Sequence, residues 1–469
     1  MLGSRYLRRG LKSFSHSKPK TTYVFFTKLI PRDSSMPFVK YLKCSRCGAR
    51  YYLKDKPIMC AKGDLGRLDI FYDYEAIKNA VSKDTLRMRP FYMWRYFEFL
   101  PVSSWKSVVS LGEGGTPLIK ARRLGEVLGL KNLYLKDETR NPTGSFKDRA
   151  MSVAVSMAVE FGYKITATAS SGNAAAALAA YSAKAGLETY AFVLEMAGYG
   201  KVAQLLFYGA KVFRVKGLGR EDPTVKMLRI VVEKYGFYPA PSFGPFNPYQ
   251  IEGPKTISYE IIEQFNWSIP HYVFVPVGAA ALLTGVWKGF KDFKNVGFIN
   301  ELPKLVAIQS TGNAPFVRAF REGQDPHNIR PWENPNTIAS GLSDPYPWDG
   351  DGGLQALKET SGYADDVTDE EILEAMKLLA KTEGIFAEPS GATGLAGLIK
   401  AVREGKVGKD DIIVVLITGH GLKDPDIVKK VSGDAPTIEP KPEEFEKVLK
   451  EVYKVSLSKE EESREQPKT

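Results

Sequence analysis

The chain of 469 residues contains three cysteines and no long apolar run. All three cysteines fall between positions 44 and 60, which excludes a disulfide framework and predicts a reducing compartment, the cytoplasm. The longest apolar runs, such as Ile412–Thr418, have the length of a strand, whereas a membrane span needs about 20 residues. The apolar and charged fractions, 43% and 25%, are those of a folded globular protein and exclude wholesale disorder.

Positive charge is concentrated at one end of the chain. Residues 1–35 hold eight Lys or Arg and one acid, so seven of the eleven net positive charges fall there. The remaining sequence has no basic motif interleaved with aromatic residues, and nucleic acid is therefore not expected as a partner. The composition of residues 1–35 predicts a disordered basic extension. An Arg-rich transit peptide, or a working start at Met36, would explain the same composition.

A small module is predicted over residues 36–75. Cys44-Ser-Arg-Cys47 has the C-x2-C spacing that lets two thiolates share one zinc ion. Only Cys60 follows, and Lys62 and Gly63 stand where the second thiolate of a partner knuckle would fall. Because a fourth ligand is missing at the usual spacing, the sequence predicts a degenerate zinc-ribbon-like module without metal. A zinc-bound ribbon is the alternative.

Between about 110 and 432, short strand-like runs alternate with helical stretches. This alternation predicts an α/β protein with doubly wound, mostly parallel sheets, which bind ligands at the C-terminal ends of the strands. The predicted strands are Asn132–Lys136, Ile165–Ala169, Thr189–Leu194, Lys211–Val215, Tyr272–Val277, Lys304–Gln309 and Asp411–Ile417. The predicted helices are 149–161, 173–185, 200–208, 253–265, 369–383 and 391–404.

After residue 435 the composition changes to Pro, Glu and Lys. Phe445, Leu449 and Val452 recur at helical spacing and predict one amphipathic helix near 442–454. Residues 456–469 read as a solvated tail, so that 435–469 forms a C-terminal helix and polar tail.

The segment Asn141-Pro-Thr-Gly-Ser-Phe-Lys-Asp-Arg149 joins a turn to a helix. Ser145 is a suitable N-cap, with Asp148 three residues later. Lys147 then lies in the first turn of the helix, where the positive end of the helix dipole lowers the pKa of its amine. A lysine with a lowered pKa is suited to forming a Schiff base. An ordinary capped helix with a surface lysine would account for Ser145 and Asp148 but not for the whole segment.

Three more strand-to-helix junctions carry glycine and small residues. Ser170-Ser-Gly-Asn173 precedes an alanine-rich helix, and Val275-Pro-Val-Gly278-Ala-Ala-Ala281 follows a buried strand. Thr418-Gly-His420-Gly-Leu-Lys-Asp-Pro425 follows the last strand. Such junctions bind anionic ligands, although each would also serve as a simple turn. Together they predict one site in a central crevice.

These motifs, with Glu388-Pro389, resemble those of the threonine synthase family among the fold-type II enzymes that depend on pyridoxal phosphate. The resemblance extends over most of residues 40–430 and implies two domains. One is a large cofactor-binding domain, 76–145 with 251–434, and the other is a small inserted α/β domain, 146–250. It also implies pyridoxal 5'-phosphate as the cofactor, a small amino acid as the substrate and a homodimer as one allowed state.

The resemblance assigns roles to individual residues. Lys147 would carry the cofactor and act as the catalytic base, Asn173 would hold the ring hydroxyl, and Thr418 would face the pyridine nitrogen. A neutral hydroxyl at that position favours elimination and replacement over transamination. The cofactor phosphate would be bound by Gly278, Ala279, Ala280 and Ala281, and the substrate by Ser145, Ser171 and Gln250.

Two loops depart from the family pattern. Gly278-Ala-Ala-Ala281 lacks two glycine-like positions, which makes a positive φ costly there. In the substrate-phosphate arm, Gly244–Gln250, the expected serine is Pro245 and the expected arginine is Gln250. Ala174 replaces a threonine that often follows the Ser-Gly-Asn turn. The sequence therefore predicts weaker binding of a phosphate ester, unless Lys255 or Arg149 supplies the missing charge.

Three functions are compatible with these observations. The first is threonine synthase activity, the conversion of O-phosphohomoserine to threonine and phosphate. The second keeps the cofactor but eliminates or replaces the β-substituent of serine, threonine or another small amino acid. The third is a non-catalytic paralog that binds an amino acid, which the altered cofactor-phosphate loop favours and the intact surroundings of Lys147 oppose.

Overall fold

The computed structural model describes residues 38–217 and 222–455. The predicted extension 1–35 and the tail 456–469 lie outside the described residues. The chain forms two compact units, one that ends at Lys423 and one that begins at Asp424. Among the described residues, no helix is long and apolar enough to cross a membrane.

A three-stranded antiparallel sheet forms the N-terminal module. Its strands are β1 (Val39–Cys44), β2 (Arg50–Tyr51) and β3 (Leu68–Tyr72), in the order β2-β1-β3. Leu42 of β1 and Ile70 of β3 are paired, and both are buried in the main hydrophobic core of the protein. The module is therefore packed against the body and does not rely on a core of its own.

The larger sheet has six strands in the order β12-β11-β10-β13-β5-β4. All neighbours are parallel except β4, which runs antiparallel to β5 at the edge. The strands are β4 (Leu118–Lys120), β5 (Asn132–Asp137), β10 (Tyr272–Pro276), β11 (Lys304–Ser310), β12 (Tyr363–Val367) and β13 (Ile412–Ile417). Alternate side chains of β13 enter hydrophobic clusters on opposite faces, which explains the continuous apolar run.

The smaller sheet has four parallel strands in the order β8-β7-β6-β9. They are β6 (Ile165–Ala169), β7 (Glu188–Leu194), β8 (Lys211–Val215) and β9 (Tyr238–Pro239). All four lie inside 146–250, the segment that the sequence predicts as an inserted domain. The two sheets with their helices confirm the predicted α/β class, with mostly parallel strands.

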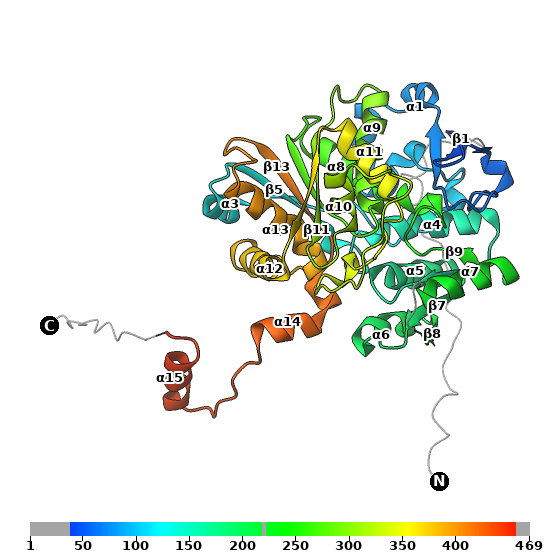
Figure 1. Cartoon of the computed structure of the whole chain (residues 1–469). Helices are drawn as coiled ribbons and strands as arrows, with labels where there is room; N and C mark the ends of the chain where they lie inside the picture. The colour runs from blue at the N-terminus through cyan, green and yellow to red at the C-terminus, as the bar shows by residue number, and fades with distance from the viewer. Residues whose placement is uncertain (1–37, 218–221, 456–469) are drawn as a thin grey trace, which may run out of the picture. The chain divides into compact units, whose positions relative to one another are not determined.

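Helices cover both sheets (Figure 1). α13 packs on β10 and β13, whereas α9 packs against α8 and also contacts β10. The helices of this unit are α1 (Tyr74–Ala80), α2 (Lys83–Arg87), α3 (Arg122–Leu128), α4 (Lys147–Phe161), α5 (Asn173–Ala185), α6 (Tyr199–Phe207), α7 (Pro223–Tyr235), α8 (Lys255–Gln264), α9 (Ala281–Asn295), α10 (Pro315–Glu322), α11 (Gly350–Glu359), α12 (Asp369–Glu383) and α13 (Pro389–Arg403).

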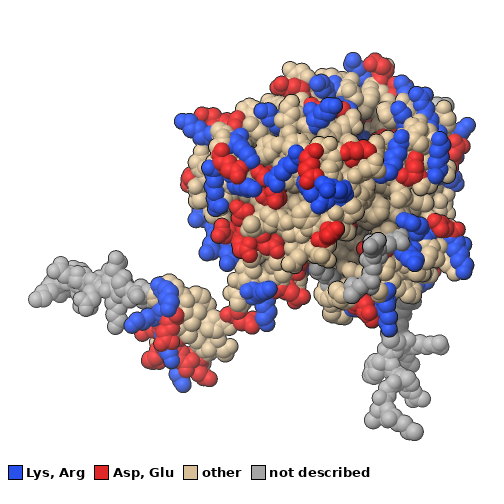
Figure 2. Space-filling model, in the orientation of Figure 1, with Lys and Arg blue, Asp and Glu red and all other residues tan. Residues whose placement is uncertain are grey.

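The second unit contains α14 (Pro425–Ser432) and α15 (Pro442–Glu451). α15 coincides with most of the amphipathic helix predicted over 442–454. On the surface of the protein, acidic and basic side chains are interspersed over the face in view (Figure 2). That face shows no broad area of one sign.

Candidate active site

Lys147 is the first residue of α4, close to the C-terminal ends of several strands. Its amine donates a hydrogen bond to the hydroxyl of Ser242, which lies in the loop after β9 and has a φ of 78°. Desolvation lowers the pKa of Lys147 to about 8, although the carboxylates of Asp344 and Asp349 oppose that shift. The predicted lowering of this pKa is thus supported, with burial rather than the helix dipole as its main cause.

The turn before α4 differs in detail from the sequence-based prediction. Phe146, not Ser145, is the N-cap residue, and its side chain makes no capping hydrogen bond. The hydroxyl of Ser145 accepts only a long contact, 3.4 Å, from the backbone N–H of Lys147. The carboxylate of Asp148 instead folds back onto Thr143 and accepts from its hydroxyl at 2.9 Å and its backbone N–H at 3.1 Å. Asp148 therefore closes the turn that presents Lys147.

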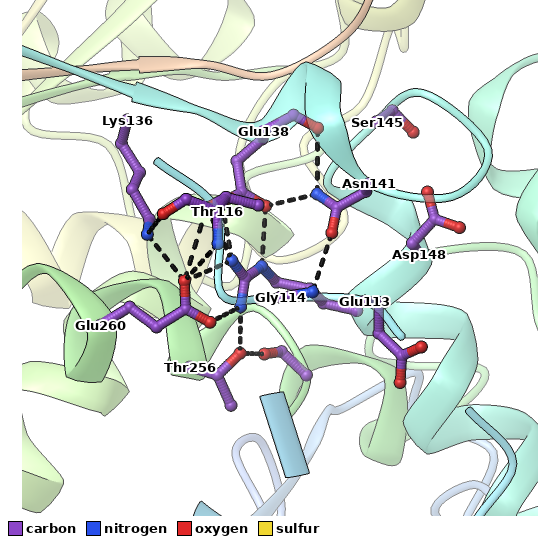
Figure 3. Close-up of polar contacts among 12 residues, drawn as sticks. Glu113, Gly114, Thr116, Lys136, Glu138, Asn141, Ser145, Asp148, Thr256 and Glu260 are labelled. Carbon is purple, nitrogen blue, oxygen red and sulfur yellow. Dashed lines mark hydrogen bonds and ion pairs between the residues drawn. The ribbon is translucent and has the colours of Figure 1, made fainter. Parts of the chain in front are cut away.

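Lys136, Glu138 and Glu260 form a buried network of charges (Figure 3). Arg149 joins this network and anchors the segment. Its guanidinium donates to Glu138 at 2.7 and 2.8 Å and to Glu260 at 2.6 and 2.8 Å. Lys136 of β5 adds a second cation, 2.7 Å from Glu260. The side-chain amide of Asn141 donates to Glu138 at 2.8 Å. Because Arg149 is held by two carboxylates, it fixes α4 to the turn after β5 and to α8, and does not supply the charge missing from the substrate arm.

The segment after β13 lies against the lysine turn. The backbone N–H of Phe146 donates to the carbonyl of Thr418 at 3.0 Å, and that of His420 donates to Gly144 at 2.9 Å. Thr418 directly follows β13 and is 4% exposed. Its side-chain hydroxyl is able to donate a hydrogen bond to a ring nitrogen. The structure thus brings two of the predicted junctions together.

Asn173 begins α5, directly after the turn that follows β6. Its amide donates to the carboxylate of Glu388 at 2.6 Å, and the backbone N–H of Glu388 donates to Gly419 at 3.0 Å. A side chain at Gly419 would come within 2.0 Å of that carboxylate, so a larger residue there would require Glu388 to move away from its present position. Ser171, in the same turn as Asn173, is half-buried. Sequence reasoning placed Glu388 in a family motif but missed its contact with Asn173.

The loop Gly278–Ala281 joins β10 to α9, whose first N–H groups have no partner within the helix. Ala280 has a φ of 67°, the left-handed conformation that is expected to be costly without glycine. The chain accepts this strain, about 1–2 kcal/mol, at a buried position. The loop therefore still begins α9 in the manner of an anion-binding turn.

The side chain of Gln250 stabilises the substrate arm through hydrogen bonds to the backbone. Its carbonyl oxygen accepts from the backbone N–H of Ser242 at 2.9 Å, and its amide donates to the carbonyl of Phe243 at 2.6 Å. Gln250 is 2% exposed, so its contact with substrate stays a prediction while its role in shaping the arm is evident. Lys255, the other cation considered for this arm, is buried against Glu252 and Asp292 at 2.6 and 2.7 Å.

These residues fit pyridoxal phosphate. An amine with a pKa near 8, the hydroxyl of Thr418 and a strand-to-helix loop are the groups that would bind its aldehyde, ring nitrogen and phosphate. Asn173 is linked to the segment after β13 through Glu388 and Gly419. The chemistry of these groups fits the cofactor even though the loop sequence differs from the family pattern.

Comparison with known proteins gives the same result. The family described as "Pyridoxal-phosphate dependent enzyme" matches residues 109–419. A threonine synthase of Methanocaldococcus jannaschii is 45% identical over 411 residues, which cover 87% of this chain and 99% of that protein. A second, from Methanosarcina acetivorans, is 43% identical and covers 85% of this chain and 95% of that protein.

Among solved structures, the processed threonine deaminase isoform 2 of Solanum lycopersicum matches with a TM-score of 0.57 at 25% identity. The match covers 68% of this chain and 82% of that one. The fold is that of the fold-type II enzymes, and pyridoxal phosphate is the cofactor of this family. The chain belongs to the threonine synthase family of pyridoxal-phosphate-dependent enzymes.

Proposed function

We propose that the protein converts O-phosphohomoserine to threonine and phosphate. The observation that carries the proposal is the amine of Lys147, with a pKa of about 8, in a turn whose Phe146 is hydrogen-bonded to the backbone carbonyl of Thr418. The similarity to threonine synthases over nearly their whole length supports the same reaction.

Pyridoxal phosphate, when bound, supplies an electron sink for negative charge that develops on the substrate. Lys147 would hold its aldehyde carbon, Gly278–Ala281 its phosphate, Asn173 its ring hydroxyl and Thr418 its ring nitrogen. The neutral hydroxyl of Thr418 does not force a proton onto that nitrogen as a carboxylate would. The site is therefore suited to elimination and replacement.

Lys147 is the proposed base. With a pKa near 8, a useful fraction of the amine is unprotonated near neutral pH and can take a proton from the substrate Cα and return it. The hydroxyl of Ser242 holds the amine in place through their hydrogen bond. The hydroxyls of Ser145, which is buried, and Ser171 are proposed to bind the substrate.

A lyase acting on serine, threonine or another small amino acid is the second candidate. The specific observation in its favour is the arm Gly244–Gln250, which carries no cation, while Arg149 and Lys255 are held in buried ion pairs. A threonine deaminase shares the fold. We favour the first candidate because its relatives match a larger share of the chain.

A substrate screen separates the candidates. Purified protein would be given O-phosphohomoserine, serine and threonine in turn, and phosphate, ammonia, 2-oxoacid and threonine would be measured. Threonine and phosphate in equal amounts from O-phosphohomoserine support the proposal. Ammonia and a 2-oxoacid from serine or threonine, with no phosphate released from the ester, support the second candidate. Protein that binds an amino acid but turns over none of the three would be a non-catalytic paralog.

We also propose a homodimer in the cytoplasm with a small amino acid substrate and no nucleic-acid partner. The mixed charges of the visible face support the last point (Figure 2). Sedimentation analysis tests the dimer, and a nucleic-acid shift assay at low salt tests the absence of binding.

A further inference from the structure

Three thiols and one carboxylate meet in the N-terminal module. Cys44 ends β1, Cys47 lies three residues later, and Cys60 and Asp64 come from the loop before β3. One ligand atom from each of the four residues lies within 4.8 Å of the others. Two loops that are separate in the sequence thus place four potential metal ligands around one point.

The sequence analysis expected no metal here because it found no fourth ligand. The reason for that expectation does not hold. The backbone N–H of Gly63 donates to Cys60 at 3.0 Å, and a φ of 66° at Gly63 reverses the chain directly after that turn. The next residue, Asp64, is thereby directed back to Cys44. A C-x2-C knuckle that starts at Cys60 would have its second cysteine at position 63. The fourth ligand is instead a carboxylate oxygen of Asp64, one residue later.

Two of the ligand–ligand distances match those of a tetrahedral site, and all four ligand atoms lie within 4.8 Å of one another. Zinc–sulfur bonds of about 2.3 Å and zinc–oxygen bonds of about 2.0 Å place two sulfurs roughly 3.8 Å apart, and a sulfur and an oxygen roughly 3.5 Å apart. The sulfurs of Cys47 and Cys60 are 3.6 Å apart. The sulfur of Cys44 is 3.4 Å from both carboxylate oxygens of Asp64.

Neighbouring groups hold the four ligands in position. The backbone N–H of Cys47 points to the sulfur of Cys44 at 3.5 Å. The hydroxyl of Tyr51 contacts the sulfur of Cys60 at 3.3 Å. The backbone N–H of Gly66 donates to Asp64 at 2.9 Å, and a side chain at Gly66 would lie 2.3 Å from the sulfur of Cys44. Supporting hydrogen bonds of this kind orient the ligands of metal sites.

We propose that Cys44, Cys47, Cys60 and Asp64 bind one zinc ion in a closed structural site. Three thiolates select a thiophilic metal, and a set of four protein ligands leaves no position for a substrate. Each thiol gives its proton to solvent when it binds the ion. The ion joins the loop after β1 to the loop before β3. This inference does not depend on the reaction proposed above.

The proposal is tested by elemental analysis of the full-length holoenzyme. The protein is purified without metal-affinity resin and without chelator. We expect about one zinc per chain, matching the one closed site. Zinc far below this ratio, with three thiols that react freely or with a disulfide between Cys47 and Cys60, would overturn the proposal. Cys60→Ser should lose the zinc, and the activity of the same sample reports whether the variant has folded.

If the cysteine variants fail to fold, a substitution of Asp64 tests the same site, because it leaves all three thiols in place. Asp64→Asn should release zinc to a chelator at least about tenfold faster than the wild type, since loss even of a supporting contact weakens metal sites by that factor. Asp55→Asn, at an exposed position of the same module, is the matched control and should release zinc at the wild-type rate. Equal rates for all three proteins would exclude Asp64 as a ligand.

Cobalt provides a spectroscopic check on the wild-type chain. The proposal expects Co²⁺-exchanged protein to show the visible bands of tetrahedral thiolate coordination, after subtraction of the zinc-loaded protein to remove absorbance by the cofactor. A spectrum of octahedral, oxygen-bound cobalt would contradict the site.

Discussion

Arg67 of the N-terminal module lies 3.7 Å from Asp349, a fully buried carboxylate beside the substrate arm. The backbone N–H of Gly244, the first residue of that arm, donates to Asp349 at 3.0 Å. Asp349 in turn donates its own N–H to Ala279 of the cofactor-phosphate loop at 2.8 Å. One buried ion pair therefore connects the module to both loops that depart from the family pattern.

We expect Arg67→Met to destabilise the protein, and more strongly at higher pH. Burial raises the pKa of Asp349 to about 7 even though Arg67 lowers it, so the pKa rises further without Arg67. A carboxyl group with a raised pKa in the folded state lowers the stability of the protein as pH rises from its unfolded pKa, about 4, to its folded pKa, and the loss then levels off. Without Arg67 the folded pKa is higher, so the loss continues to a higher pH. Once Asp349 is ionised and unpaired, the loss should reach about 3–5 kcal/mol.

Thermal melting one pH unit below and above 7 measures this effect. Arg50→Met, at an exposed position of β2, serves as the control and should change little at either pH. An equal loss of melting temperature at both pH values would show that Arg67 acts through packing or through its ion pairs with Asp69 and Asp351, and not through Asp349.

Lys147→Ala should abolish covalent attachment of the cofactor and lower turnover at least 100-fold, about the lower limit for loss of a general base. Borohydride reduction of the wild type, followed by digestion and mass spectrometry, should place the pyridoxyl group on the peptide that contains Lys147. Lys184→Ala, at an exposed position of α5, should retain the adduct. An adduct on any other lysine would contradict the assignment.

Uptake of pyridoxal phosphate by the cofactor-free protein should depend on pH. Desolvation lowers the pKa of Lys147 to about 8, and only the unprotonated amine attacks the aldehyde. The initial rate, followed by absorbance, should rise with pH up to about 8 and then level off. A rate that continues to rise tenfold per pH unit beyond 9 would indicate an ordinary lysine.

Gln250→Arg tests how the substrate phosphate is held. An arginine in the arm should lower KM for O-phosphohomoserine, because a charged hydrogen bond contributes about 1.5–3 kcal/mol. The variant also loses the contacts of Gln250 with Ser242 and Phe243, so a reduction in stability of about 1–2 kcal/mol is expected. Gln355→Arg, exposed on α11, controls for the added charge. Efficient turnover by the wild type, with no gain in the variant, would show that the phosphate is bound elsewhere.

Local patterns predicted the regular elements well. The apolar run of β13 identified a strand buried on both faces, and helix α12 spans the predicted residues 369–383. α12 has a capping box between Thr368 and Glu371 and a left-handed Gly384 at its end, both local features of the sequence. No strand was predicted at β4, β9 or β12, and β12 contains two adjacent aspartates, which are unfavourable in strands. Asp365 is accommodated there by Lys400 and Lys406 from distant segments.

The sequence by itself determined the α/β class and pointed to the lysine that we propose as the cofactor's attachment site, because strand and helix patterns and turn motifs depend on neighbours within a few residues. Only the tertiary structure decided the partners of these groups. Ser242 at the amine of Lys147, Asp349 beside the arm and Asp64 among the cysteines come from separate loops. Burial and charge depend on what packs around a group in three dimensions, and no single segment contains that information.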